Sequence, residues 1–469
     1  MLNDLSEIIA INSIEAERSA SDAPFGQQLR NALDWFLNKA SYYGLKVGEN
    51  NGYYGWAEYG EDGAPIIGIP AHIDIVPVGN GWTTDPLTLR IEDGKAYGRG
   101  VADDKGPLVA ALWALKRIKE EKLALRHRIR LIAGCNEESG SACLKKYAAE
   151  DEIPVMSIVP DADFPLINSE KGILHLCANI VVDDAVKENL INISASERIN
   201  VVPASASVTL NKNGSAYNYL IENFGSLTAD IFRSPRIALR LVEIGADFDD
   251  FAIAEDENTF TIIASGEAGH AMDPDKADNA LWKIFAVLTA IIPTSKTLDV
   301  IYSSLCHSDA TKRIGVYCED KESGTLTMSM DMAGFDTDTL SLYFDCRLPI
   351  CANPDNIEST LQSVLVAGGE INAVVKRERF AENLYVSADT PMIKTLLDVY
   401  SKATGVQNPQ PLQTGGGTYA RELPSAVAFG PTFPGAETNI HNADENIEIE
   451  HLNKLVDIYY SALIELDKL

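Results

Sequence analysis

The sequence predicts an α/β protein in which a helix-flanked mixed sheet is interrupted by an inserted α+β domain. Three observations lead to this prediction: helical and extended patterns alternate over about the first 175 residues, a strand-rich texture follows, and the alternating pattern returns near residue 390. Alternation of this kind is typical of a sheet covered by helices. A chain of 469 residues is also longer than one hydrophobic core usually accommodates, which predicts two domains. We expect a first domain of residues 1–175 plus 385–469, and a second of residues 176–384.

The elements of the first domain follow from the spacing of apolar residues and from the residues that end each segment. Gly44 ends the first helix, and Pro107 stands early in the second, where a missing N–H costs nothing. Thr390 and Gly405 frame a later helix as its cap and stop. The expected helices are 24–43, 106–121, 392–404 and 447–469, and the expected strands are 66–75, 128–135 and 153–159.

The inserted domain reads as strands with helices between them. β-branched and alternating segments predict the strands, and apolar residues at helical spacing predict the helices. The expected strands are 174–182, 205–210, 259–265, 325–332 and 339–347, and the expected helices are 217–223, 235–245 and 279–292. This mixture predicts an α+β domain.

Composition excludes several classes of protein. The net charge of −29, from 39 basic and 68 acidic side chains, disfavours nucleic acid, because phosphate binding needs basic patches. The surplus of acid indicates solubility, or a field that attracts cations. We find no apolar run of 18 residues and no basic-then-apolar start, so we expect neither membrane insertion nor secretion. Seven scattered cysteines without a C-x-x-C pair predict free thiols in the cytoplasm.

Candidate metal ligands stand where predicted strands end. Sites in open α/β sheets gather at the carboxyl ends of strands. Two histidines and several carboxylates in such places suit a pair of divalent cations that activate one water. The segments are His72-Ile-Asp74, Asp103-Asp104-Lys105-Gly106, Asn136-Glu137-Glu138, Pro160-Asp161-Ala-Asp163, and His441 with the acidic residues after it.

The chemistry of a two-metal centre distributes roles among these residues. One carboxylate must span both ions, and Asp103 is placed to do so at a strand-to-helix junction that contains two glycines. Glu137 and Glu138 point to different sides of the chain, so one can bind metal while the other faces the water. Asp74 can orient the imidazole of His72. The residues alone do not decide between Asp161 and Asp163 as a ligand.

Taken together, these segments resemble the dinuclear zinc peptidases, the family of carnosinases, aminoacylases and glutamate carboxypeptidases. The motifs Pro160-Asp161-Ala-Asp163-Phe-Pro165, Gly415-Gly-Gly417-Thr-Tyr-Ala-Arg421 and Phe429-Gly-Pro431 are similar to its dipeptidase V branch. The resemblance implies a cis peptide bond after the bridging aspartate. It also implies roles for seven residues: His72 and Asp161 on one metal, Glu138 and His441 on the other, Asp103 bridging, Glu137 as general base and then acid, and Asp74 as the residue that orients His72.

The inserted domain would be the lid of such an enzyme. His270, in Gly269-His270-Ala-Met-Asp-Pro274, matches the lid histidine that stabilises an oxyanion. Arg347 matches the residue that holds the substrate carboxylate, and Asn200 matches a further lid contact. Gly415, in the glycine-rich motif, is a candidate for substrate binding. Gly269 stands where Ser is common in the family, which bears on substrate fit rather than on the chemistry.

The expected function is hydrolysis of unblocked dipeptides by a metal-bridged hydroxide, with Glu137 as the base. Two alternatives are an N-acyl-amino-acid deacylase with the same dinuclear site and a metal-binding protein that has lost catalysis; an intact Glu137 argues against the latter. The expected cofactors are two divalent cations, Zn²⁺ or, because carboxylates outnumber imidazoles, Mn²⁺ or Co²⁺. The expected partner is a small peptide substrate, and we expect a monomer because in the dipeptidase V branch the long lid replaces a partner subunit.

Overall fold

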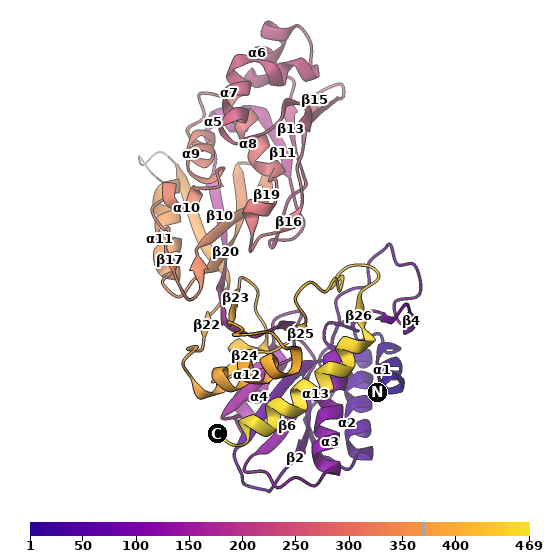
Figure 1. The fold of residues 1–469 in the computed structure, drawn as a ribbon. Helices are drawn as coiled ribbons and strands as arrows, with labels where there is room; N and C mark the ends of the chain where they lie inside the picture. The colour runs from indigo at the N-terminus through magenta and orange to yellow at the C-terminus, as the bar shows by residue number, and fades with distance from the viewer. Residues whose placement is uncertain (367–370) are drawn as a thin grey trace. The chain divides into compact units, whose positions relative to one another are not determined.

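The structure, a computed structural model, describes residues 1–366 and 371–469, which form two compact units (Figure 1). Unit 1 comprises Met1–Glu170 and Leu384–Leu469, and unit 2 comprises Lys171–Asn383. The sequence predicts boundaries at 175/176 and 384/385. The first boundary lies five residues earlier because strand β10 (Gly172–Val181) pairs with β20 (Thr339–Leu348) from Gly172 onward, which places its first residues in unit 2.

Unit 1 holds the predicted α/β sheet and its helices. Its helices are α1 (Leu2–Ile9), α2 (Gln27–Tyr42), α3 (Lys105–Glu120), α4 (Ala142–Glu150), η4 (Tyr419–Glu422), α12 (Pro391–Thr404) and α13 (Ile449–Leu466). Its strands are β1 (Lys46–Asn50), β2 (Tyr54–Tyr59), β3 (Ile66–His72), β4 (Arg90–Glu92), β5 (Lys95–Tyr97), β6 (Arg128–Gly134), β7 (Met156–Val159), β8 (Ala162–Asp163), β9 (Ile167–Glu170), β22 (Leu384–Tyr385), β23 (Leu412–Thr414), β24 (Ala426–Ala428), β25 (Pro431–Thr432) and β26 (Asn446–Glu448).

The main sheet of unit 1 is mixed, as predicted. Its strand order is β1-β2-β6-β3-β7-β24-β9-β22, with β23 paired to β9. The central strands β6, β3, β7 and β24 run parallel to one another. The pairs nearer the edges, β1-β2, β2-β6, β24-β9 and β9-β22, are antiparallel, whereas β23 pairs parallel with β9. Every residue of β3 and β6 is buried, which is typical of parallel strands covered on both faces. Helix α3 packs on β3 and β6, and α13 packs along α3.

Unit 2 is the predicted α+β domain. Its helices are α5 (Asp184–Asn189), α6 (Ser215–Phe224), η1 (Ala229–Arg233), α7 (Pro235–Glu243), η2 (Phe248–Asp250), η3 (Pro274–Lys276), α8 (Ala280–Ile291), α9 (Lys296–Leu305), α10 (Ala310–Arg313) and α11 (Pro354–Leu365). Its further strands are β11 (Leu190–Ser194), β12 (Val201–Val202), β13 (Ser205–Asn211), β14 (Phe251–Glu255), β15 (Thr259–Ser265), β16 (Gly269–His270), β17 (Glu319–Asp320), β18 (Gly324–Thr325), β19 (Thr327–Asp336) and β21 (Asn372–Ala381).

Two four-stranded antiparallel sheets organise unit 2. Their orders are β19-β20-β10-β21 and β11-β13-β15-β14. Both contribute to one apolar core, in which almost every side chain of α8 is buried. The fold class is therefore confirmed for both units.

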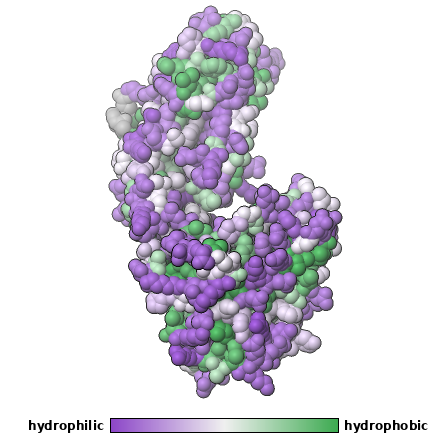
Figure 2. All heavy atoms as spheres, in the orientation of Figure 1, coloured by the Kyte–Doolittle hydropathy of each residue, from purple (hydrophilic) through white to green (hydrophobic). Residues whose placement is uncertain are grey.

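Several elements differ from the sequence prediction. The strand expected over 153–159 begins at Met156, and the closing helix begins at Ile449 because residues 446–448 pair with β5 as β26. On the face shown in Figure 2, hydrophilic side chains predominate, in keeping with the acidic composition. Within residues 1–366 and 371–469, no helix combines the length and the apolar character that a membrane span requires.

Candidate functional site

Three neighbouring parallel strands bring the predicted ligands to one edge of the main sheet. His72 is the last residue of β3, and Glu137 and Glu138 follow the end of β6. Asp161 follows β7, which pairs with β3 on its other side. Because parallel strands end at the same edge of a sheet, these side chains converge there. The motifs predicted at strand ends therefore form one cluster.

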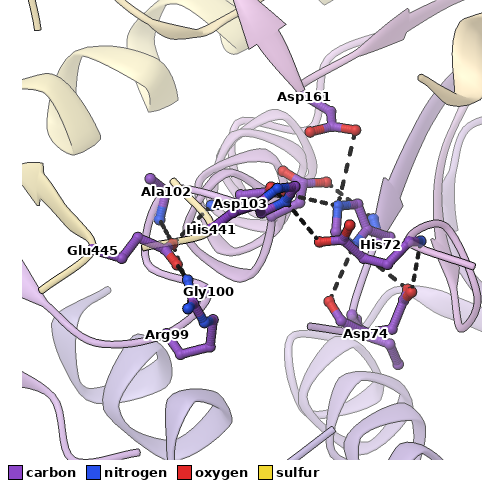
Figure 3. A network of polar contacts seen from close by, with 12 residues as sticks. His72, Asp74, Arg99, Gly100, Ala102, Asp103, Asp161, His441 and Glu445 are labelled. Carbon is purple, nitrogen blue, oxygen red and sulfur yellow. Dashed lines mark hydrogen bonds and ion pairs between the residues drawn. The ribbon is translucent and has the colours of Figure 1, made fainter. Parts of the chain in front are cut away.

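Asp103 lies between two imidazoles from distant parts of the chain (Figure 3). Its Oδ1 is 2.8 Å from Nε2 of His72, and its Oδ2 is 2.9 Å from Nε2 of His441. His72 is fully buried, whereas about half of the His441 side chain is exposed. A carboxylate whose two oxygens face two different nitrogen donors has the geometry of a group that spans two cations.

The remaining carboxylates surround this pair. Glu138 Oε1 is 3.2 Å from Nε2 of His441, and Asp161 Oδ2 is 3.9 Å from Nε2 of His72. Ligand atoms of His72, Asp103 and Glu138 lie within 4.8 Å of one another, as do those of His72, Glu137 and Asp161. Each set has donors that suit a divalent cation, and His72, which belongs to both sets, can bind through Nε2 to one cation only.

The cluster contains more carboxylates than its two imidazoles can neutralise, and the pKa values of its side chains reflect this excess of negative charge. Burial and the repulsion of neighbouring carboxylates raise the pKa of Glu137 to about 8. Burial and the nearby charge of Asp103 raise the pKa of Asp161 well above its usual value. Hydrogen bonds to carboxylates raise the pKa of His441 to about 10; they also raise that of His72, although burial opposes its charge. Oxygen and imidazole donors that attract protons this strongly suit divalent cations such as Zn²⁺ and Mn²⁺.

Asp74 lies beside the other ring nitrogen of His72. Nδ1 of His72 is 3.1 Å from the carbonyl oxygen of Asp74 and 3.5 Å from its carboxylate Oδ1. The second carboxylate oxygen accepts a hydrogen bond of 3.0 Å from the backbone N–H of Glu138. The sequence predicts contact through the carboxylate, and the structure adds the backbone carbonyl as the nearer partner. Both contacts direct Nε2 of His72 toward Asp103.

Glu445 is a buried residue of the site to which the sequence assigns no role. Its Oε1 accepts hydrogen bonds from the backbone N–H groups of Gly100, Ala102 and Asp103 at 2.9–3.2 Å. Its Oε2 accepts a hydrogen bond of 2.7 Å from Arg99 (Figure 3). Glu445 thus fixes the loop that carries Asp103 to the segment that carries His441, four residues earlier. The acidic residues after His441 were the available signal, but the sequence does not show what they contact.

The loop after Asp103 is fixed on its other side as well. The peptide bond between Asp103 and Asp104 is cis, as the family resemblance implies. Asp104 Oδ2 accepts a hydrogen bond of 3.0 Å from the backbone N–H of His72. The buried Lys105 donates to the carbonyl oxygens of Ile8 and Ile11 at 3.1 and 2.8 Å, which connects this loop to the end of α1. Burial lowers the pKa of Lys105 to about 7.

The structure places two predicted lid residues side by side in unit 2. His270 ends β16 and is paired with Val201 of β12, the neighbour of Asn200. The backbone N–H of Ala271 donates to the carbonyl oxygen of Asn200 at 3.0 Å, and Nδ1 of His270 accepts from the N–H of Met272 at 3.0 Å. The exposed His270 is therefore held in a defined orientation.

Arg347 lies on β20 in a buried polar cluster of unit 2. Its guanidinium donates to both carboxylate oxygens of Asp345, at 2.6 and 2.8 Å, and Nε2 of His175 is 3.3 Å from the same carboxylate. Asp331, on the neighbouring strand β19, accepts a hydrogen bond from Ser329, and its other oxygen is buried without a hydrogen-bond partner among the described residues. Burial and the charge of Asp345 raise the pKa of Asp331 to about 8.

Gly415 begins a glycine-rich loop in unit 1 that connects β23 to η4. Tyr419, the first residue of η4, packs edge-on against the ring of His72 with centroids 6.2 Å apart. Its hydroxyl lies 2.8 Å from Sγ of Cys143, and an added Cβ at Gly134 would lie 2.0 Å from that hydroxyl oxygen. The loop is thus attached to a residue that packs against the candidate metal ligand His72.

Comparison with known proteins identifies relatives over the whole chain. The sequence profile described as "Peptidase family M20/M25/M40" matches residues 68–465. YtjP of Bacillus subtilis, provisionally named a dipeptidase, is 33% identical over 100% of this chain and 97% of its own length. A similarly named protein of Staphylococcus epidermidis is 29% identical over 99% and 97%. The crystal structure of human carnosine dipeptidase 1 shares the fold, with a TM-score of 0.58 and 16% identity over 100% of this chain and 96% of that one.

Replacing Glu445 by Gln should weaken both the fold and the metal centre. The amide cannot balance the buried charge of Arg99, and breaking a buried ion pair costs about 3–5 kcal/mol. Urea denaturation should show this loss, and titration calorimetry with Mn²⁺ should show weaker binding. Glu448→Gln, at an exposed position three residues away, should change stability by less than about 0.5 kcal/mol. Unchanged Mn²⁺ affinity in folded Glu445→Gln would contradict the proposed link between the two loops.

Replacing Asp331 by Asn should stabilise the protein increasingly as the pH rises. The folded state keeps Asp331 protonated up to about pH 8, whereas the unfolded chain ionises it above about pH 4. Its contribution to stability therefore declines between these values, by at most about 1.4 kcal/mol per pH unit, and the neutral amide removes that decline. Urea denaturation at pH 5, 6, 7 and 8 measures the difference. Asp336→Asn, at an exposed position of β19, is the control, and a difference that does not vary with pH would refute the buried, protonated state.

Proposed function

The chain belongs to peptidase family M20/M25/M40, and from this premise we propose that it is a metal-dependent dipeptidase that acts on unblocked dipeptides. The observation that carries the proposal is the carboxylate of Asp103, placed between His72 and His441 at an edge of the sheet crowded with acid. The names of the relatives that match nearly their full lengths support the dipeptide substrate.

We assign the metal ligands from the contacts in unit 1. Asp103 would bridge two divalent cations, of which Zn²⁺, Mn²⁺ or Co²⁺ fit the donors. His72 and Asp161 would complete one site, and Glu138 and His441 the other. When bound, such cations lower the pKa of water and polarise the carbonyl group of a substrate. The raised pKa values of Asp161 and His441 support the assignment, because cations would replace the protons that these two side chains attract.

Glu137 is the proposed general base and acid. It follows β6 and lies with His72 and Asp161, and no hydrogen bond of its carboxylate to another described residue competes with a water molecule. Its carboxylate would take a proton from the attacking water and give it to the nitrogen of the leaving amine. A partly buried carboxylate suits both steps, because it can accept a proton from water and pass it on within the site.

The substrate-binding residues are assigned to both units. In unit 2 we assign Arg347 to the substrate carboxylate, as the family resemblance implies; Asp345, which accepts from its Nε and Nη2, holds the guanidinium in a fixed plane. His270 would stabilise the oxyanion and Asn200 would support it, and their adjacent positions on β12 and β16 favour a common role. In unit 1 we assign Gly415 to substrate contact.

We further propose that the protein is a monomer of the cytoplasm. All seven cysteines are free, as a reducing compartment favours. Unit 2 contains two separate four-stranded sheets, which supports a lid that needs no partner subunit.

A matched set of peptides tests the substrate class. An unblocked dipeptide, its N-acetyl form and the corresponding tripeptide are incubated with protein that has been chelated and then supplied with Zn²⁺ or Mn²⁺, and mass spectrometry follows the products. We expect hydrolysis of the unblocked dipeptide alone, with loss of activity on chelation. Preference for the acetylated compound would instead indicate an N-acyl-amino-acid deacylase, and no turnover with either metal would refute the proposed catalysis.

The pair Glu137→Gln and Glu138→Gln separates the base from the ligand. Glu137→Gln should lower kcat by about 10²–10⁴-fold, the usual contribution of a general base, with Mn²⁺ affinity little changed. Glu138→Gln should lower the Mn²⁺ affinity itself, because it removes a charged ligand. Steady-state kinetics and calorimetry measure the two effects. Loss of Mn²⁺ binding in Glu137→Gln would show that Glu137 is a ligand instead.

A further inference from the structure

Glu170 lies where the chain leaves unit 1 for unit 2. It is the last residue of β9, and Lys171 begins unit 2. The returning chain enters unit 1 at Leu384 of β22, which pairs directly with Glu170. On its other side β9 pairs with β23, where Thr414 is opposite Glu170. Glu170 therefore lies in the segment that leads to unit 2, and its backbone pairs with the segment that returns from unit 2. It also pairs with β23, the strand that precedes the glycine-rich loop.

The side chain of Glu170 holds the far end of that loop. It is fully buried, and its Oε1 accepts a hydrogen bond of 2.7 Å from the hydroxyl of Thr418. Its Oε2 accepts hydrogen bonds from the backbone N–H of Thr418 at 3.1 Å and from Nε of Arg421 at 3.2 Å. Both carboxylate oxygens are thus engaged with the segment immediately after Gly417. Such a buried, fully bonded carboxylate fixes the backbone around it.

Arg421 extends the same network into the loop. Its Nη2 donates to the carbonyl oxygen of Gly416 at 3.0 Å. An added Cβ at Gly417 would lie 1.9 Å from the guanidinium, so the loop passes directly over Arg421, and a larger residue there would require the guanidinium to move. The hydroxyl of Thr414 accepts a hydrogen bond of 3.1 Å from the N–H of Gly416. The shape of the loop is therefore set by Glu170 and Arg421 together.

The network ends at the wall of the metal cluster without including a proposed ligand. Thr418 caps η4 by accepting a hydrogen bond from the N–H of Ala420 at 3.1 Å. The next residue, Tyr419, packs against the ring of His72. Displacement of Thr418 would move the loop first, while His72 retains its own bonds to Asp74 and Asp103.

We propose that Glu170 is a positioning residue for substrate binding, which holds the Gly415–Gly417 loop in shape from the strand where the chain passes between the units. This inference rests on the proposed function, because it gives the loop a role in binding a dipeptide. In this inference, Glu170 contributes to substrate binding although it contacts neither the substrate nor a metal. Its removal should therefore impair KM, and leave metal binding and the chemical step largely intact.

The test compares Glu170→Gln with the wild-type protein in dipeptide hydrolysis and in Mn²⁺ titration. Glutamine offers one acceptor oxygen where three donors need two, and it carries no charge to pair with Arg421. We expect KM to rise at least tenfold, kcat to change less than threefold, and Mn²⁺ affinity to change less than twofold. If Glu170→Gln does not fold by circular dichroism, Thr418→Val replaces it, and Thr418→Ser should restore most of the KM because it keeps the hydroxyl.

Asp467→Asn is the matched control. Asp467, just after α13, is also a buried carboxylate that accepts hydrogen bonds from backbone N–H groups. Its donors, Arg126 and His127, precede the first residue of β6, whereas the cluster follows the last residue of that strand. Its replacement should lower stability and leave KM unchanged. Unchanged KM in folded Glu170→Gln or Thr418→Val, or a parallel fall in Mn²⁺ affinity, overturns the inference alone. Absence of dipeptide turnover by the wild-type protein overturns the proposed function, and the inference with it.

Discussion

Repulsion among buried carboxylates is the constraint on which unit 1 depends. The parallel strands β6, β3 and β7 end side by side, so the acidic residues that follow them cannot move apart without disrupting the sheet. Charges a few ångströms apart in a buried site interact far more strongly than in water. Two imidazoles relieve part of this repulsion, and the raised pKa values of Glu137 and Asp161 show that part remains. A rigid sheet thereby creates a strong demand for cations at one edge.

Two buried glutamates organise the loops around this edge in the same way. Glu445 accepts hydrogen bonds from three backbone N–H groups of the loop with Asp103, and Glu170 binds the backbone and side chain of Thr418. Each also pairs with an arginine, so its charge is balanced inside the protein. Loops rich in glycine are otherwise costly to order, because glycine loses the most conformational freedom on folding. A carboxylate with several acceptor positions orders such a loop from one point.

The residues that sequence could predict are those whose position follows from local pattern. His72, Glu137 and Glu138 stand at the ends of recognisable strands, as does the segment with Asp161 and Asp163, and the geometry of a parallel sheet brings such ends together. The choice of Asp161 over Asp163 came from the family resemblance. The pairing of Arg99 with Glu445 joins residues 346 positions apart, and no local pattern reveals it. Likewise, the first boundary between the units, after Glu170, depends on the pairing of β10 with β20, which is a property of the folded domain. Local signals predicted the elements and most of the cluster, and long-range contacts determined the rest.

The order of residues along the chain has a consequence for biosynthesis. The loop with Asp103 emerges from the ribosome early, whereas His441 and Glu445 follow only after the whole of unit 2. At synthesis rates of about 5–20 residues per second, the interval is on the order of tens of seconds. During that time the acidic edge of the sheet lacks the imidazole of His441. It also lacks Glu445, whose hydrogen bonds fix the loop with Asp103. A nascent chain therefore completes the proposed cation-binding centre only after unit 2 has been synthesised and has had time to fold.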